Sequence, residues 1–180
     1  MSGIVGSYFN TRGSGVVAKL GSDGQVFTST GAGLSQGFEA AAGGGKVLQA
    51  VTATDNTERS STTASWITAD NTLSVNITPS ATSSKVLVMT TFNSGNVSGA
   101  DTRYTINRDA TNIGDATYGI VTTTHGDPNA MYATAAMTVL DSPSSTSALT
   151  YQVYVYAGGG TAYINKYPTL GTITVMEIGA

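Results

Sequence analysis

The chain of 180 residues is long enough for one domain of ordinary size with an appendage. Only 11% of its residues are charged and it has no cysteine, which excludes disulfides and thiolate metal sites and leaves a surface rich in Thr, Ser, Gly and Ala. The net charge of −3, with eight scattered Lys and Arg residues, argues against nucleic-acid binding, and no apolar stretch is long enough for a membrane span.

Residues 1–45 are glycine-rich, and their larger apolar residues are spaced too widely for a continuous strand or helix. Such a segment cannot offset its own ordering entropy. We predict an extended arm that becomes ordered against neighbouring chains, with Gly43–Gly45 as a hinge; the alternative is an ordinary disordered terminus. The candidate contact residues of the arm are Leu20, Val26, Phe27, Leu34 and Phe38.

Residues 46–180 show the two-residue alternation of half-buried strands, interrupted by residues that favour turns. We predict strands at Val47–Thr54, Leu73–Ile77, Lys85–Phe92, Arg103–Arg108, Tyr118–Thr123, Tyr132–Leu140, Leu149–Tyr156, Ala162–Tyr167 and Thr172–Ile178. The predicted turns are Thr78–Ser80, Asn93–Asn96, Gly126–Pro128, Asp141–Pro143 and Ala157–Gly160. This pattern indicates an all-β fold, an antiparallel jelly-roll-like sandwich of about 8–9 strands.

The predicted strands Leu149–Tyr156 and Ala162–Tyr167 are expected to form a hairpin around Ala157–Gly160. Tyr156 would then lie opposite Thr161, and Tyr154 opposite Tyr163. The core side would carry Leu149, Tyr151, Val153, Val155, Ala162 and Ile164. The other side would carry the candidate interface or receptor-contact residues Tyr154, Tyr156, Tyr163 and Tyr167, together with Thr150, Gln152 and Asn165. The alternative is a sheet whose outer face simply carries tyrosines.

The sequence contains no convincing motif for metal binding, nucleotide binding or catalysis. The single histidine, His125, lies in a predicted loop without a second His or Cys to share a metal. Gly13–Ala18 matches the dinucleotide-binding pattern G-x-G-x-x-A, but no strand precedes it and the residues after it cannot continue a helix. Gly43–Lys46 matches a phosphate-binding loop only in part. A polar turn explains Asp109, Asn112 and Asp115 better than calcium binding does. We therefore predict no enzyme activity, no catalytic or metal-ligating residue and no cofactor.

Several segments resemble those of known proteins. Leu20–Gly33, which reads LGSDGQVFTSTGAG, resembles a segment common in phage tail-fibre and related virion proteins. The opening Ser2–Ser7 and the ending Ile173–Ala180 are similar to the two ends of short virion proteins of marine tailed bacteriophages. Lys46–Val51 and Ile77–Val88 resemble the same group.

The resemblance implies a bacteriophage virion structural protein, a homotrimeric tail-fibre or capsid-decoration protein with a jelly-roll-like domain. Its N-terminal arm would attach it to other virion proteins, and the β domain would project for host contact or for clamping capsomers. Partners would be further copies of the chain, other virion proteins and a host surface glycan or protein. We expect synthesis in the host cytoplasm and final location in the virion. The alternative from another class is a lectin-like carbohydrate-binding module or depolymerase domain.

Overall fold

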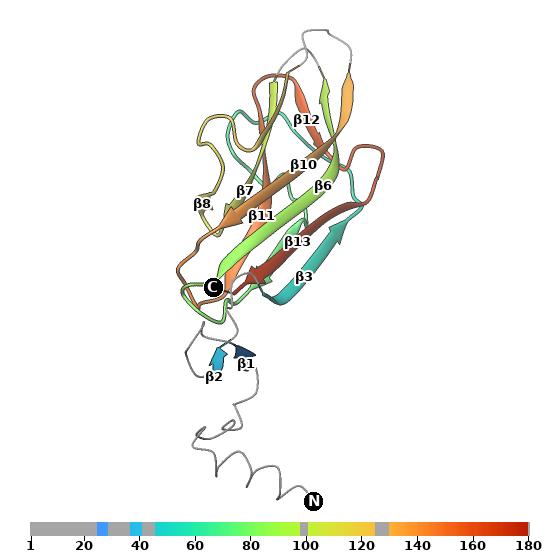
Figure 1. Cartoon of the computed structure of the whole chain (residues 1–180). Coiled ribbons are helices and arrows are strands. Elements are labelled where there is room, and N and C mark those ends of the chain that lie inside the picture. Colours follow the sequence, from blue (N-terminus) through green and yellow to red (C-terminus); the bar gives the residue numbers. More distant parts are fainter. Residues whose placement is uncertain (1–24, 29–36, 41–45, 98–100, 125–129, 180) are drawn as a thin grey trace, which may run out of the picture. The chain divides into compact units, whose positions relative to one another are not determined.

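The structure is a computed structural model that describes residues 25–28, 37–40, 46–97, 101–124 and 130–179 (Figure 1). Candidate residues Leu20, Leu34 and His125 lie outside the described residues, as do the predicted hinge Gly43–Gly45 and turn Gly126–Pro128. The chain divides into two compact units, Met1–Gly43 and Gly44–Ala180. Each unit is described by itself.

The first unit contains two short strands, β1 (Gln25–Thr28) and β2 (Gly37–Ala40), which pair antiparallel with Phe27 opposite Phe38. The prediction that this segment holds no strand was wrong. The prediction rested on the wide spacing of apolar residues along the whole segment, which does not report two isolated strands of four residues each. Their backbone hydrogen bonds come from pairing with each other, so wide spacing of apolar residues along the segment does not prevent the pairing.

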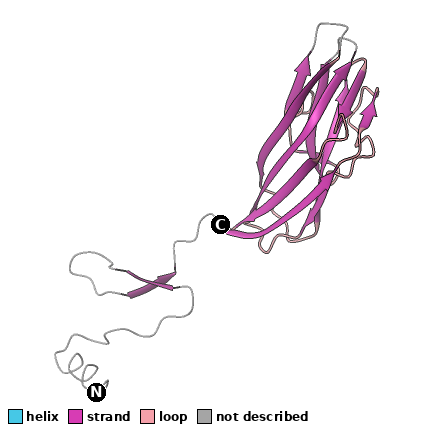
Figure 2. Cartoon of the chain, turned by 90° about the vertical axis from the view of Figure 1, so that its right-hand side faces the viewer, coloured by secondary structure: helices cyan, strands magenta, loops and turns pink. Residues whose placement is uncertain are grey.

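The second unit is a sandwich of two antiparallel sheets without a helix in its described part (Figure 2). The first sheet contains β3 (Val47–Asp55), β13 (Gly171–Ile178), β6 (Lys85–Val97), β12 (Thr161–Ile164), β4 (Arg59–Ser61) and, along the other edge of β6, β10 (Met131–Asp141). The second contains β5 (Ser74–Ile77), β11 (Leu149–Ala157), β7 (Asp101–Arg108), β8 (Thr111–Asn112) and β9 (Val121–Thr124). The predicted all-β, jelly-roll-like sandwich is confirmed.

All nine strands predicted for residues 46–180 are confirmed, with boundaries that differ by a few residues. The predicted turn Asn93–Asn96 is wrong, because β6 continues to Val97. Pairing of this part of β6 with β10 on one edge and β12 on the other outweighs the turn preference of its residues. The unpredicted strands β4 and β8 have three and two residues and are too short to show a pattern.

The core lies between the sheets and is built from the inward side chains of both. Its largest fully buried members are Leu73, Phe92, Tyr104, Ile106, Met137, Tyr151, Ile164 and Ile173. The Tyr104 hydroxyl donates to the backbone carbonyl of Tyr163 at 2.7 Å and so connects β7 of the second sheet to β12 of the first. Burial raises the pKa of Tyr104, which keeps this donor protonated.

A second connection between the sheets centres on Asp141 at the end of β10. Its Oδ2 accepts from Arg108 Nη1 at 2.6 Å and from the Tyr151 hydroxyl at 2.7 Å. Arg108 and Tyr151 come from β7 and β11 of the second sheet. The carboxylate therefore fixes the edge strand β10 over the facing sheet.

Glu177 on β13 is a buried carboxylate, 1% exposed, at the end of the sandwich where the chain enters β3. Its Oε1 accepts from the backbone N–H and the hydroxyl of Ser80 at 2.7 and 2.6 Å, and its Oε2 accepts from Gln49 Nε2 at 2.6 Å. Burial raises the pKa of Glu177, but these hydrogen bonds outweigh it and lower the pKa to about 2. The carboxylate thus ties β13, β3 and the β5–β6 turn together.

Glu177→Gln should lower the free energy of unfolding at pH 7 by about 2 kcal/mol, because an amide cannot accept all three hydrogen bonds. The folded pKa lies below the ordinary 4.5, so the contribution of the carboxylate is present above about pH 5 and is lost as the pH falls toward 2. Urea unfolding at pH 7 and pH 3 measures both effects.

The control is Asp70→Asn, because Asp70 is exposed at a left-handed φ of 55°, which Asn tolerates. It should leave stability unchanged at both pH values. A Glu177→Gln variant with the stability and pH dependence of the parent protein would contradict the role of the carboxylate.

Candidate interaction surfaces

The predicted hairpin between Leu149–Tyr156 and Ala162–Tyr167 is wrong, because the two strands belong to different sheets. β11 pairs with β5 and β7, whereas β12 pairs with β6 and β4. Gly159 and Gly160, with φ values of 148° and 67°, lie in the connection that crosses from one sheet to the other. Alternation along a strand specifies which side chains point inward but not which strand lies beside it.

The inward residues of both strands are nevertheless those that the alternation predicted. Leu149, Tyr151, Val153, Val155, Ala162 and Ile164 are all buried. Asn165, which was expected on the outer side, is also fully buried: its φ is 55° and its Nδ2 donates to the Asp55 carbonyl at 2.9 Å. The four candidate tyrosines are therefore divided between the sheets, with Tyr154 and Tyr156 on the second and Tyr163 and Tyr167 on the side of the first.

Three rows of side chains cross the outer face of the first sheet, at positions that alternate with the buried residues of β6 and β13. In register, the first row, called the apolar row below, is Ala50, Met176, Leu87 and Leu140; the second is Thr52, Thr174, Met89 and Thr138; the third is Thr54, Thr172, Thr91 and Ala136. The hydroxyls of Thr52 and Thr174 lie 2.9 Å apart on this face. The three rows contain no charged residue.

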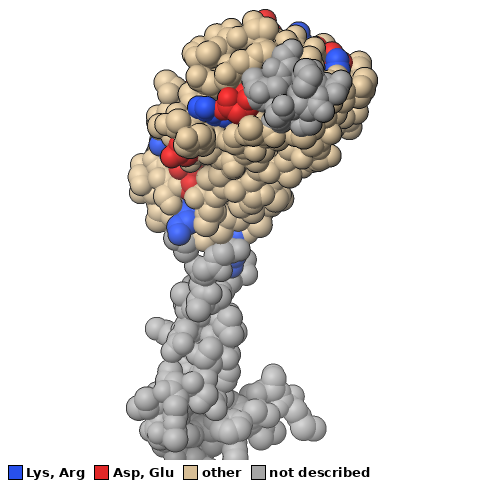
Figure 3. All heavy atoms as spheres, turned by 90° about the horizontal axis from the view of Figure 1, so that it is seen from above, with Lys and Arg blue, Asp and Glu red and all other residues tan. Residues whose placement is uncertain are grey.

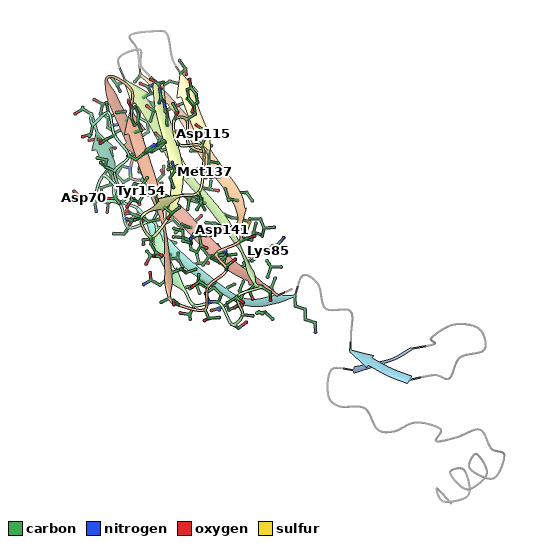
Figure 4. The ribbon with its side chains drawn as sticks, turned by 90° about the vertical axis from the view of Figure 1, so that its left-hand side faces the viewer. Asp70, Lys85, Asp115, Met137, Asp141 and Tyr154 are labelled. Atoms are coloured by element: carbon green, nitrogen blue, oxygen red, sulfur yellow. The ribbon has the colours of Figure 1, made fainter. Side chains whose placement is uncertain are left out.

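The apolar row lies near the end of the sandwich at which the chain enters, marked by Lys85 in Figure 4. Leu140 on β10 is 52% exposed, and β3, at the opposite edge of the four strands, adds Val47 and Leu48, which are 57% and 49% exposed. Contiguous exposed apolar side chains of this kind mark interaction surfaces. Figure 3 shows that acidic and basic side chains are also few on the side of the domain seen there and lie in small groups on an otherwise uncharged surface.

The opposite end of the first sheet carries a cluster of three tyrosines around Lys166. The ammonium nitrogen lies 4.1 Å from the ring centroid of Tyr163, 5.4 Å from that of Tyr167 and 5.7 Å from that of Tyr132. It also lies 2.8 Å from Glu58 Oε1, and this hydrogen bond lowers the pKa of Glu58. The structure thus brings Tyr163 and Tyr167 together, with Tyr132 as a member that the sequence did not indicate.

The outer face of the second sheet carries a linear series of planar groups, called the aromatic row below: Trp66, Tyr156, Arg103 and Tyr118. The rings of Trp66 and Tyr156 are 5.7 Å apart between centroids. The guanidinium carbon of Arg103 lies 4.7 Å from the ring centroid of Tyr156 and 5.0 Å from that of Tyr118. Trp66 and Tyr118 come from loops. The strand predicted at Tyr118–Thr123 begins only at Val121, so the assignment of Tyr118 to a strand was wrong and strand alternation could not place either residue beside Tyr156. The one available signal was a single tryptophan outside every predicted strand.

The described parts of the chain contain no group of three or more His, Asp or Glu side chains that could hold a metal ion. Asp109 Oδ1 accepts from the backbone N–H of Thr150, and Asp115 Oδ1 from those of Thr117 and Tyr118, which agrees with the polar-turn interpretation.

No helix among the described residues is long and apolar enough to cross a membrane.

No family model matches the chain, and no curated protein matches it. Among solved structures, the chain is similar to the infectious bursal virus protein of derived T=1 particles, with 14% identity, a TM-score of 0.42 and coverage of 83% of this chain and 35% of that one. It is similar to infectious bursal disease virus VP2 of a subviral particle, with 12% identity, a TM-score of 0.34 and coverage of 89% and 46%. The chain thus spans less than half of either viral chain.

A third similar structure is the tripod from the baseplate of bacteriophage Tuc2009, with 12% identity, a TM-score of 0.36 and coverage of 97% of this chain and 90% of that one. Likeness at this level concerns the arrangement of strands only. The interaction surfaces of the chain therefore have to be judged by their own chemistry.

Gly95→Ala should lower the free energy of unfolding by about 1–3 kcal/mol. This is the opposite of the usual effect, because a strand is normally more stable with alanine than with glycine at an interior position. A Cβ at Gly95 would lie 2.8 Å from Tyr132 Cδ1 and 3.2 Å from Tyr163 Cβ. The matched control is Gly179→Ala, whose new Cβ meets only the exposed Leu48 side chain, at 3.2 Å. Equal urea midpoints for the two variants would show that the tyrosine cluster is not tightly packed over Gly95.

Proposed function

We propose that this chain is a bacteriophage virion structural protein that acts by assembly rather than by catalysis. It would be a homotrimeric fibre or capsid-decoration protein, anchored by residues 1–45, with its β domain projecting for host contact or capsomer clamping. The observation that carries the assembly role is the outer face of the first sheet, where an apolar row and two hydroxyl-rich rows cross four strands without a charge.

The composition of this face fits a subunit interface. The cores of interfaces are depleted of charged residues, since burying an unpaired charge is costly. Threonine hydroxyls can pair with one another across a contact, as those of Thr52 and Thr174 do within the sheet. A closed symmetric oligomer buries such a face on every copy, which a monomer leaves in water.

The area of the three rows indicates how far the proposed interface must extend. Four strands and three rows cover roughly 20 by 20 Å at ordinary strand spacing and rise. This is about half of the surface that each partner contributes to a stable interface. The contact must therefore include the exposed side chains of Val47 and Leu48 on β3, which continue the apolar surface at the sheet edge.

The virion context is supported by the segments that resemble phage virion proteins. The most specific of them, Leu20–Gly33, lies in the first unit, and Lys46–Val51 coincides with the first residues of β3. The remaining resemblance at Ile77–Val88 covers the β5–β6 connection, which contributes Ser80 to the Glu177 hydrogen bonds. The resemblance therefore includes residues with a defined structural role in the domain.

Leu140→Glu should convert the oligomer to monomer, because it places a charge within an otherwise uncharged contact. The matched control is Leu170→Glu: Leu170 is 64% exposed, against 52% for Leu140, but lies in the loop before β13 rather than on the three rows. Light scattering coupled to size exclusion measures the mass of each variant. A parent protein that is monomeric, or an oligomer that tolerates Leu140→Glu, would contradict this interface.

Removal of residues 1–45 should leave an oligomer that no longer joins particles. The β domain has its own core, so its folding and its proposed interface do not require the arm. Size exclusion tests the oligomer, and incorporation into virions during infection tests attachment. Unchanged incorporation of the shortened protein would overturn the proposed anchoring role.

A further inference from the structure

The aromatic row on the second sheet differs in chemistry from the uncharged face of the first. Its four planar groups come from four separate segments: the β4–β5 loop (Trp66), β11 (Tyr156), β7 (Arg103) and the β8–β9 loop (Tyr118). Tyr118 is 60% exposed, whereas the side chain of Arg103 is 18% exposed. The guanidinium thus fills the space between two phenol rings and leaves ring surface accessible beside it.

Hydrogen bonds hold each member of the row in place. The backbones of Ile67 and Val155 exchange two hydrogen bonds, of 3.1 and 2.8 Å, which seat Trp66 beside the end of β11. Trp66 Nε1 donates to the Ala116 carbonyl at 2.9 Å, and Arg103 Nη1 donates to the Thr117 carbonyl at 2.8 Å. Both carbonyls belong to the loop that carries Tyr118.

The same loop is closed on itself. Asp115 and Gly119 exchange backbone hydrogen bonds of 3.0 and 2.9 Å, and the Asp115 carboxylate accepts from the N–H of Tyr118 at 2.7 Å. Gly119 has a φ of 70°, and a Cβ there would lie 2.7 Å from Trp66 Cη2. Only glycine therefore lets the tryptophan pack on this turn. The row is organised before any ligand arrives, so binding would cost little ordering of side chains.

The charge of the row is balanced. Arg103 Nε forms an ion pair with Asp101, so neither an anion nor a cation meets an unpaired opposite charge. The neighbouring outward side chains of β11 are polar or aromatic, Gln152 and Tyr154, whereas Thr105 and Asn107 of β7 are buried. Tyr118 is the one large apolar side chain on this face, among the described residues, that is strongly exposed. Aliphatic side chains suited to a protein contact are concentrated on the first sheet instead.

We infer that the aromatic row is a binding platform for an uncharged pyranose unit of a saccharide. The C–H groups on one face of a sugar ring carry partial positive charge and complement the electron-rich faces of Tyr118, Tyr156 and Trp66. Hydroxyls at the rim of the sugar meet the side chains of Arg103 and Asp101, which supply donors and acceptors. The platform lies on the sheet opposite the proposed interface and stays accessible in the oligomer.

This inference specifies the host-contact part of the proposed function and rests on it for its biological role, but sugar binding in solution can be tested without virions. Trp66 is the only tryptophan in the chain, so intrinsic tryptophan fluorescence reports on this row alone. The full-length protein is titrated with methyl α-glucoside, methyl β-galactoside, N-acetylglucosamine and its β-1,4 oligomers. At least one probe should give a saturable change, with Kd in the range of about 0.1–10 mM.

Two variants and one control assign the signal to the row. Tyr118→Ala should weaken binding at least about tenfold. Arg103→Lys keeps the positive charge but removes the planar guanidinium group, so it should also weaken binding. The control is Tyr167→Ala, because Tyr167 is 62% exposed, against 60% for Tyr118, but belongs to the Lys166 cluster of the first sheet. It should leave the affinity unchanged.

Two results would overturn the inference: no saturable change with any probe up to about 50 mM, or binding that Tyr118→Ala and Arg103→Lys leave intact. Light scattering on the same samples separates this test from that of the proposed interface. A protein that binds sugar as a monomer would retain the platform and lose the proposed assembly. An oligomer that binds none would retain the assembly and lose the platform.

Discussion

Strand β6 organises the first sheet, because its thirteen residues are paired along both edges. β10 follows one edge over eleven residue pairs, from Asp141 opposite Val86 to Met131 opposite Asn96. The other edge is shared by β13 near its start and β12 near its end. Alternation along β6 determines which side chains face each side of the sheet. Val86, Val88 and Phe92 point into the core. Leu87, Met89 and Thr91 point outward, and each belongs to a different one of the three outer rows. The same alternation along β6 therefore produces both the core and the candidate interface.

Alternation of apolar and polar residues allowed the strands and their inward sides to be predicted from the sequence. Val153, Val155 and Ile164 are buried as their positions indicated. The partners of these strands could not be predicted, since the same alternation fits a hairpin and a crossing between sheets equally well. The turn assigned to Asn93–Asn96 failed for a related reason, because pairing with two neighbours overrides a local turn preference.

The candidate surfaces were only partly accessible to sequence reasoning. Tyr154 and Tyr156 were identified as outward residues, but their neighbours Trp66 and Tyr118 lie in loops and come close only through the packing of the β4–β5 and β8–β9 connections on the sheet. The apolar row escaped notice because its members lie on four strands. Each strand contributes one residue to this row, which is unremarkable until the register is known.

The position at which the chain enters the domain has a mechanical consequence. The chain enters β3 at Val47 and leaves β13 near Ile178, and these two residues are paired side by side at the same end of the sheet. When residues before β3 are held and the far end of the domain is pulled, tension runs parallel to β3. The backbone hydrogen bonds that join β3, over Val47–Asp55, to β13 are then loaded together in shear rather than broken one after another from the end. The Gln49–Glu177 hydrogen bond lies across the same pair of strands and adds a side-chain connection close to the point where the load is applied.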